Sequence, residues 1–300
     1  MRTSSLLTLL VLLMGITQAK AQISIQTEYI GESRYGDEEN NNIGNGKGSA
    51  IVYQATANIP ISMKTNKDNL PVVWGVSLAG AYASLDNKNF TEELVVSDIV
   101  NASFSLYNMR PISKKWSLLT AVGAGVFTDQ TQISKMGARN ILGNAGVIFI
   151  KKINTKLDLG GGLAFNNSFG FPMVFPALYL SYNSPGRYVF NVSLLDGVRA
   201  SAGYQLTDYF TLSIVGLMNG QMALTQRAGK EVIFTHQYMV GGLRPEFKIN
   251  KHITIPITVG ISGARPAYYA EKSLKSMFST KDKFQFKSAP YAAVQVNYNF

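Results

Sequence analysis

The last ten residues of the chain, YAAVQVNYNF (residues 291–300), decide the fold. Ala292, Val294, Val296, Tyr298 and Phe300 alternate with mostly polar neighbours. Successive side chains of a β-strand point to opposite faces, so the alternation predicts a strand with one apolar and one polar face. In a membrane barrel the apolar face meets lipid, whereas in a soluble sandwich it meets a second sheet. The alternation by itself leaves both arrangements open.

The same alternation recurs along the whole chain and predicts an all-β transmembrane barrel of antiparallel, up-and-down strands. We expect 14 strands, each long enough for a tilted crossing of a bilayer. The alternative count is 12, because the region 166–200 can be divided in two ways. The expected strands are 23–35, 48–62, 71–85, 95–110, 116–128, 140–151, 156–166, 171–182, 187–195, 198–206, 209–221, 235–249, 253–265 and 286–300.

The links between these strands alternate in length, as is usual when short periplasmic turns face longer external loops. Tight reversals are also expected at Asn167 to Gly170 and at Asp196-Gly197. Both termini then lie on the periplasmic side. Longer links are expected near 36–47, 86–94, 129–139, 222–234 and 266–285. Five prolines fall inside expected strands and, lacking an N–H, should lie at bulges or outside the hydrogen-bonded ladder: Pro172, Pro176, Pro245, Pro256 and Pro290.

The N-terminus has the three parts of a cleaved signal peptide. Arg2 gives a positive start, residues 6–16 are an apolar run, and Ala19-Lys20-Ala21 offers small residues at a cleavage site. The run is too short to span a membrane as a helix. We therefore expect a signal peptide over 1–21 and an outer-membrane domain over 22–300, beginning at Gln22.

The composition suits an exported barrel. The chain is 46% hydrophobic and 15% charged and has no cysteine, which excludes disulfides, thiolate metal sites and thiol catalysis. Its net charge of +10 is scattered rather than gathered with aromatic residues, so nucleic acid is not an expected partner. Anionic lipid headgroups or anionic solutes are better candidates.

Signal peptide, alternating strands, unequal links and the terminal Phe300 together resemble bacterial outer-membrane β-barrel proteins. The resemblance covers the mature chain and is nearest to an uncharacterised family of plug-less single-chain barrels. It implies location in the outer membrane, contact with its lipids, and recognition of Tyr298 and Phe300 by the barrel-assembly machinery. The chain departs from long-chain fatty-acid transporters, which share 14 strands, in lacking an N-terminal hatch.

Four charged residues are candidates for lining the pore: Asp158, Arg199, Arg244 and Glu246. Alternation places their side chains inward, and a charge facing lipid at mid-depth costs up to ~2–4 kcal/mol. They are expected to form a weak selectivity set or a constriction. The alternative is an Arg–Glu pair that only bridges neighbouring strands.

The sequence offers little for catalysis or metal binding, and we expect neither an enzyme nor a cofactor. His236 lies in an expected strand, but Tyr238 stands where outer-membrane lipid hydrolases carry a serine, which leaves no local nucleophile. The acidic cluster Asp37, Glu38 and Glu39 lacks the spacing of a calcium loop.

The expected function is therefore a passive channel for small hydrophilic solutes. A structural or surface-interaction barrel that acts through its external loops is the alternative, and a lipid-modifying enzyme is third. The solute, the gating and the oligomeric state are not indicated by the sequence.

Overall fold

The structure is a computed structural model that describes residues 21–37, 39, 41–90, 94–166, 173–183, 186–193, 198–263, 265–272 and 284–300. The expected signal peptide, the reversals at 167–170 and 196–197, Pro172 and Glu38 lie outside the described residues. In the described part, two single turns of 3-10 helix are the only helices, η1 (Ile133–Lys135) and η2 (Ala138–Asn140). No helix there is long and apolar enough to cross a membrane.

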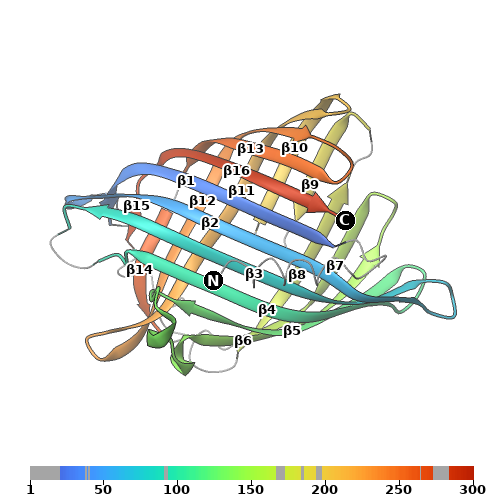
Figure 1. Cartoon of the computed structure of the whole chain (residues 1–300), viewed down its shortest axis with the longest axis horizontal. Helices are drawn as coiled ribbons and strands as arrows, with labels where there is room; N and C mark the ends of the chain where they lie inside the picture. The colour runs from blue at the N-terminus through green and yellow to red at the C-terminus, as the bar shows by residue number, and fades with distance from the viewer. Residues whose placement is uncertain are drawn as a thin grey trace, which may run out of the picture.

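The remaining elements are strand segments joined in one antiparallel sheet (Figure 1). They are β1 (Gln22–Gly36), β2 (Asn42–Thr65), β3 (Pro71–Lys88), β4 (Asp98–Pro111), β5 (Trp116–Thr128), β6 (Ile141–Lys152), β7 (Leu157–Asn166), β8 (Met173–Asn183), β9 (Tyr188–Ser193), β10 (Val198–Thr207), β11 (Phe210–Arg227), β12 (Lys230–Lys248), β13 (Ile253–Ser262), β14 (Arg265–Glu271), β15 (Gln285–Phe286) and β16 (Ala289–Asn299).

The sheet closes into a ring of 14 wall strands. β13 and β14 are two parts of one strand, because both pair with β12. β15 and β16 likewise both pair with β1. The ring closes where Gln22 lies opposite Asn299, and from there the β1–β16 ladder runs to Ile30 and Tyr291. The expected fold and the count of 14 are confirmed.

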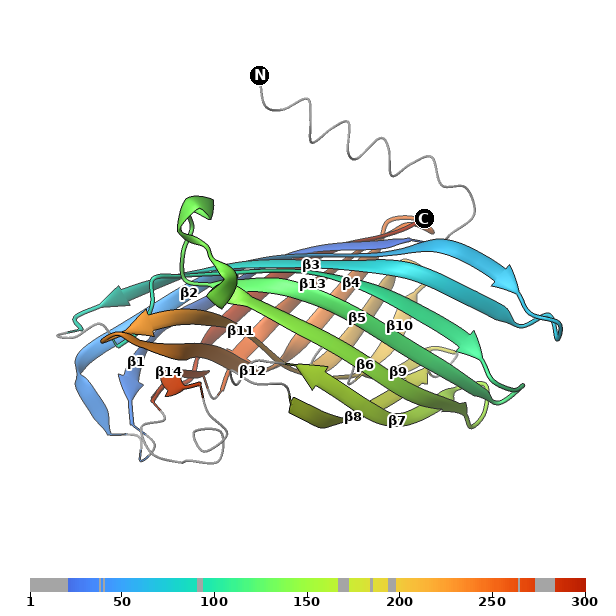
Figure 2. The same cartoon turned by 90° about the horizontal axis from the view of Figure 1, so that it is seen from below.

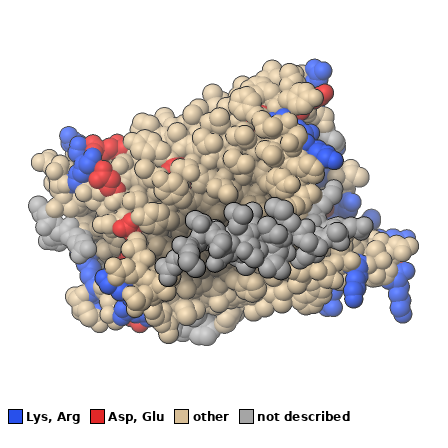
Figure 3. All heavy atoms as spheres, viewed as in Figure 1, with Lys and Arg blue, Asp and Glu red and all other residues tan. Residues whose placement is uncertain are grey.

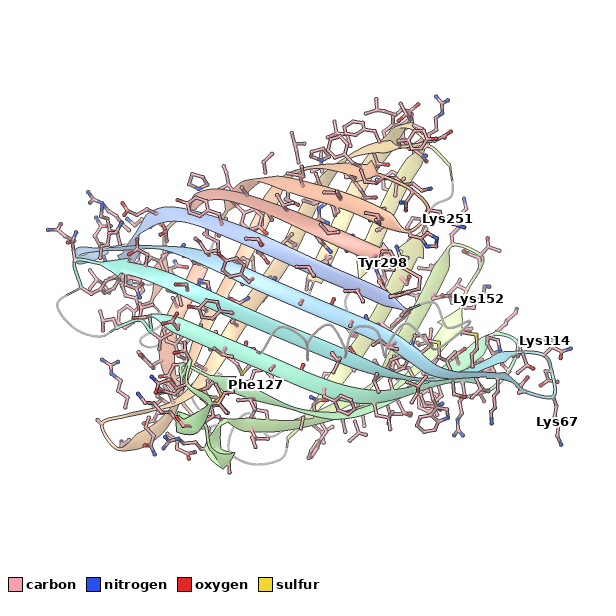
Figure 4. The ribbon with its side chains drawn as sticks, viewed as in Figure 1. Lys67, Lys114, Phe127, Lys152, Lys251 and Tyr298 are labelled. Carbon is pink, nitrogen blue, oxygen red and sulfur yellow. The ribbon has the colours of Figure 1, made fainter. Side chains whose placement is uncertain are left out.

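The two ends of the barrel differ. One end, called the turn end below, holds the short turns and both described termini; the backbone N–H of Phe300 donates to the carbonyl of Ala21 at 2.9 Å. Lys67, Lys114, Lys152 and Lys251, one from each of four short turns, all lie at this end (Figure 4). The opposite end, called the loop end, carries the longer links.

The outer face is apolar, as the alternation predicts. On β16 the side chains of Val294 and Val296 are 49% and 42% exposed, whereas Tyr291 and Ala293, of opposite parity, are buried. Figure 3 shows the same division on a larger scale: the visible charged residues gather towards the two ends, with an uncharged surface between them. At the loop end, Tyr53 and Tyr82 stack at 6.3 Å on neighbouring strands near the edge of this surface.

One of the expected long loops is largely strand and a second begins as strand, which corrects the expectation for both. The expected loop 222–234 is the end of a hairpin, in which the β11–β12 ladder continues to Arg227 and Lys230. Ala228 and Gly229 have φ of +50° and +76°, the left-handed conformation of a two-residue hairpin turn. The expected loop 266–285 also begins with strand, because β14 continues to Glu271.

The prolines in the described strands follow the expectation only in part, because each stands outside one ladder but is paired in the other. Pro245 lies where the β12–β13 ladder is interrupted, but it pairs with Leu212 of β11. Pro290 lies just beyond the last β1–β16 pair, but it pairs with Ile261 of β13. Pro176 and Pro256 likewise pair on one side, with Leu163 of β7 and Glu246 of β12.

The lipid-facing assignment of the outer face predicts unequal effects at adjacent positions of β11. Ile214 is 66% exposed on the outer face, whereas Ser213 lines the lumen. We expect Ile214→Arg to lower the free energy of unfolding by about 2–4 kcal/mol, because the charge would face lipid. Ser213→Arg, in a polar lumen, should change it by less than about 1 kcal/mol. Urea unfolding of the barrel in lipid vesicles measures both, and equal losses would refute the assignment.

Candidate functional site

The lumen holds a polar pocket in its turn-end half, on the inner faces of β9 to β12. This turn-end pocket has a volume of about 300 Å³. Its inward polar side chains come from alternate positions of the four strands, as pleating requires. They are Asn191, Arg199, Ser201, Thr211, Ser213, Arg244 and Glu246.

Three of the four candidate pore residues are therefore brought together. Arg199 comes from β10, and Arg244 and Glu246 come from β12. Asp158 does not line this pocket; it lies on β7 near the turn end, paired with Lys152 and Ser181. Nothing in this arrangement establishes what the four residues do.

The charges in the pocket are not neutralised by one another. Arg244 donates from Nε to the Thr258 hydroxyl at 2.9 Å. The ion pairs among the described residues are all at the loop end and contain none of Arg199, Arg244 and Glu246. The alternative of a wall-bridging Arg–Glu pair is thus not formed among these residues.

A buried carboxylate that the sequence analysis did not single out lies next to the pocket. Glu28 of β1 is 0% exposed. One of its oxygens accepts from the Tyr291 hydroxyl at 2.7 Å, and the other accepts from the side-chain amides of Gln54 at 2.6 Å and Asn219 at 3.2 Å. Its partners are 26 to 263 residues away in the chain. The sequence contains one signal that could have pointed to Glu28: it is an inward-facing acid in the otherwise uncharged residues 22–31 of β1.

The loop-end half of the lumen is filled by packed side chains, called the loop-end core below. Its buried members come from β1 to β4, β11, β12 and β14 to β16 and from the β3–β4 link. An aqueous channel would leave its lining accessible to water, but these side chains are at most 6% exposed. The members are Ile30, Tyr35, Ala50, Val52, Ala83, Leu85, Val95, Val96, Ile99, Ala223, Phe234, Tyr238, Val240, Ala267, Phe286, Ala289, Tyr291 and Ala293.

His236 belongs to the same region. It is fully buried, and its Nδ1 lies 3.2 Å from the Oε1 of Gln221. It lies in a strand, as expected, and its side chain is inside the packed half of the lumen, next to Tyr238. It is therefore not at the lipid surface where lipid hydrolysis would take place.

The β11–β12 hairpin closes this half of the barrel because β11 leans across the lumen. The β10–β11 ladder reaches only to Met218, so the rest of β11 has no described strand on that side. Instead its backbone at Met222 both accepts from and donates to the Asn101 side chain of β4, at 2.6 and 3.3 Å. The Asn140 amide donates to the carbonyl of Leu224 at 2.7 Å. Figure 2 shows the hairpin beside the η1–η2 segment that carries Asn140.

These asparagine amides bond the free backbone groups of β11, as a neighbouring strand would. A strand edge inside a protein needs partners for its N–H and C=O groups, because an unpaired backbone group away from water is costly. Side chains of asparagine can replace those partners, since the amide carries both a donor and an acceptor. The contact therefore docks one strand edge against the opposite wall.

Comparisons with known proteins give a family and a general architecture. The family whose description is "Domain of unknown function (DUF6268)" matches residues 17–299. No curated protein sequence matches the chain. Among solved structures, the chain is similar to an outer-membrane channel from Pseudomonas putida F1, with 9% identity, a TM-score of 0.45, and coverage of 94% of this chain and 96% of that one.

Two further solved structures are also similar to the chain. A mutant of the TodX monoaromatic hydrocarbon channel has 9% identity and a TM-score of 0.45, with coverage of 95% of this chain and 91% of that one. The translocator domain of the autotransporter NalP from Neisseria meningitidis has 14% identity and a TM-score of 0.35, with coverage of 99% and 95%. These likenesses concern the barrel architecture.

Because Glu28 accepts hydrogen bonds at both carboxylate oxygens, we expect its carboxylate to stabilise the folded barrel. Glu28→Gln would turn an amide N–H₂ towards groups that themselves donate, so we expect it to cost about 1–3 kcal/mol of unfolding free energy. Glu246→Gln is the matched control, because Glu246 lines the pocket without a described ion pair. Urea unfolding midpoints compare the two. A loss no larger for Glu28→Gln than for Glu246→Gln would show that these bonds contribute little.

Proposed function

We propose that this chain, which belongs to the family of the domain of unknown function DUF6268, is an outer-membrane channel for small hydrophilic solutes. The structure would then be its closed state. The observation that carries the proposal is the contrast inside one lumen, a polar pocket in the turn-end half and a packed apolar core in the loop-end half.

Membrane insertion is supported by the surface and by the ring. The closed ladder satisfies the backbone groups of the wall, which a bilayer demands because it offers no water to bond them. The apolar side chains point outwards, and the charges visible in Figure 3 lie at the ends. The resemblance of the sequence to outer-membrane barrels, together with its expected signal peptide, favours the outer membrane, with the turn end in the periplasm.

The solute class follows from the pocket. Hydroxyl, amide and charged groups line about 300 Å³, which suits a small hydrophilic solute that can replace water at these groups. The positive charges of Arg199 and Arg244 favour anions and the Glu246 carboxylate favours cations. The proposed selectivity is therefore weak.

Because the loop end is closed, a solute could pass only when part of the barrel moves. The β11–β12 hairpin is the element to move, because the free edge of β11 is held against the opposite wall by side-chain hydrogen bonds and packing and not by a strand ladder. Loss of these bonds would shift the balance from the packed state towards a state with a continuous lumen.

Conductance of the refolded barrel in planar bilayers tests the proposal. We expect rare openings for the wild-type chain. In Asn101→Ala/Asn140→Ala we expect open probability to rise, because lost hydrogen bonds worth about 2 kcal/mol in total would shift the equilibrium by roughly thirtyfold.

Asn108→Ala is the matched control. It removes a buried asparagine from β4 as well, but Asn108 donates to the carbonyl of Val73 on the adjacent wall strand and not to β11. It should leave open probability unchanged. Folded barrels that never conduct, in the wild type and in the double variant, would reject the channel and favour the alternative of a barrel that acts through its external loops.

Ion selectivity tests the roles proposed for the charged residues. A unit charge about 10 Å away contributes about 0.4 kcal/mol in water. Removing the charge makes the pore less favourable for an anion and more favourable for a cation by about this amount each. In the Asn101→Ala/Asn140→Ala background, Arg199→Gln or Arg244→Gln should thus lower the anion-to-cation permeability ratio roughly fourfold. Glu246→Gln should raise it. Reversal potentials under a salt gradient measure the ratio, and no shift in any of the three would place the conduction path elsewhere.

A further inference from the structure

The loop-end core contains an arginine that has no counter-charge among the described residues. Arg265, the first residue of β14, is 1% exposed. Its Nη2 donates to the carbonyl of Gly48 at 2.7 Å, and its guanidinium lies 4.0 Å from the ring centroid of Phe286. Within the described part of the chain, its Nε and Nη1 have no hydrogen-bond partner, and Arg265 forms no ion pair.

The packing holds this guanidinium in place. A Cβ on Gly48 would lie 2.8 Å from the Phe286 ring and 3.1 Å from Oδ1 of Asn87, so a larger residue at position 48 would require the ring to shift. Phe286 in turn lies 4.9 Å from the ring of Tyr35, whose hydroxyl donates to the carbonyl of Ala267 at 2.7 Å. The charge is thus fixed between aromatic rings and backbone, away from the water outside.

Other polar groups near Arg265 in the barrel wall also lack partners. The hydroxyl of Ser33 is buried and unbonded, and Ser33 pairs with Gly48, the residue that Arg265 contacts. Ser262, just before β14, is 0% exposed and its hydroxyl is unbonded as well. Buried polar groups are nearly always bonded, so several together on one side of a core indicate a missing partner.

The chemistry of the missing partner follows from its surroundings. A buried charge without compensation costs several kcal/mol, and water can bond its N–H groups but cannot neutralise it. The unbonded groups that can donate are two guanidinium nitrogens and two hydroxyls, and they outnumber the other unbonded groups, Oδ1 of Asn87 and Nε2 of His236. The surplus of donors matches an acceptor. The enclosed position among apolar side chains suits a single small ion rather than an extended solute.

We infer that the loop-end core holds one small monovalent anion of the chloride class, bound by the guanidinium of Arg265. The anion would act as an internal counter-ion that stabilises the packed half of the barrel. This site is separate from the turn-end pocket, whose lining does not include Arg265.

Thermal unfolding of the refolded barrel tests the site in solution. When gluconate is replaced by chloride at constant ionic strength, we expect the Tm of the wild-type chain to rise by at least about 3 °C, because only the folded state binds the ion. Arg265→Met should lose this rise, since an apolar side chain of similar length leaves no charge to neutralise. Arg34→Met is the matched control: Arg34 is an exposed arginine at the same end of the barrel, and the variant should keep the rise.

A direct measurement does not depend on the folding of any variant. Crystals of the wild-type chain soaked in bromide should show an anomalous peak beside Arg265. The inference is overturned if no peak appears there, or if wild type and Arg265→Met respond equally to chloride. A peak without a chloride-dependent Tm would indicate an adventitious ion only and would also overturn it.

Discussion

The whole structure depends on the pairing of backbone N–H and C=O groups within a wall that faces lipid. A bilayer offers those groups no water, so the sheet must close on itself. Here the closing ladder joins the first and last strands, from Gln22–Asn299 to Ile30–Tyr291. Where the ladder is interrupted, other groups take over. Proline stands where no donor is needed, and at Met222 and Leu224 asparagine side chains bond the free edge of β11.

Much of the fold could be predicted from the sequence because the alternation of side chains follows directly from the pleat. The 14 strands and the outward face of β16 come from that rule. The rule failed at residues 222–234, where strand alternation continues up to a two-residue turn. It also led us to expect polar side chains on the inner face, whereas Ile30, Val52 and Phe234 are apolar and buried in the loop-end core.

The candidate site was predictable only in part. The cost of a charge in lipid places Arg199, Arg244 and Glu246 inward, and the structure adds that they share one pocket. Asp158 lies outside this pocket because β7 is several strands away from β10 and β12 around the ring. A local pattern of alternation does not contain that distance. Glu28 and Arg265 depend on partners from distant strands, such as Tyr291 and Gly48. Such contacts arise only when the ring has closed.

The strand β11 belongs to two places in the molecule. Its first part pairs with β10 in the wall, and Thr211 and Ser213 there line the turn-end pocket. Its last part bonds the side chains of Asn101 and Asn140 on the other side of the lumen. Because the strand is continuous, a displacement at one of these places is carried along its backbone to the other, as along a lever.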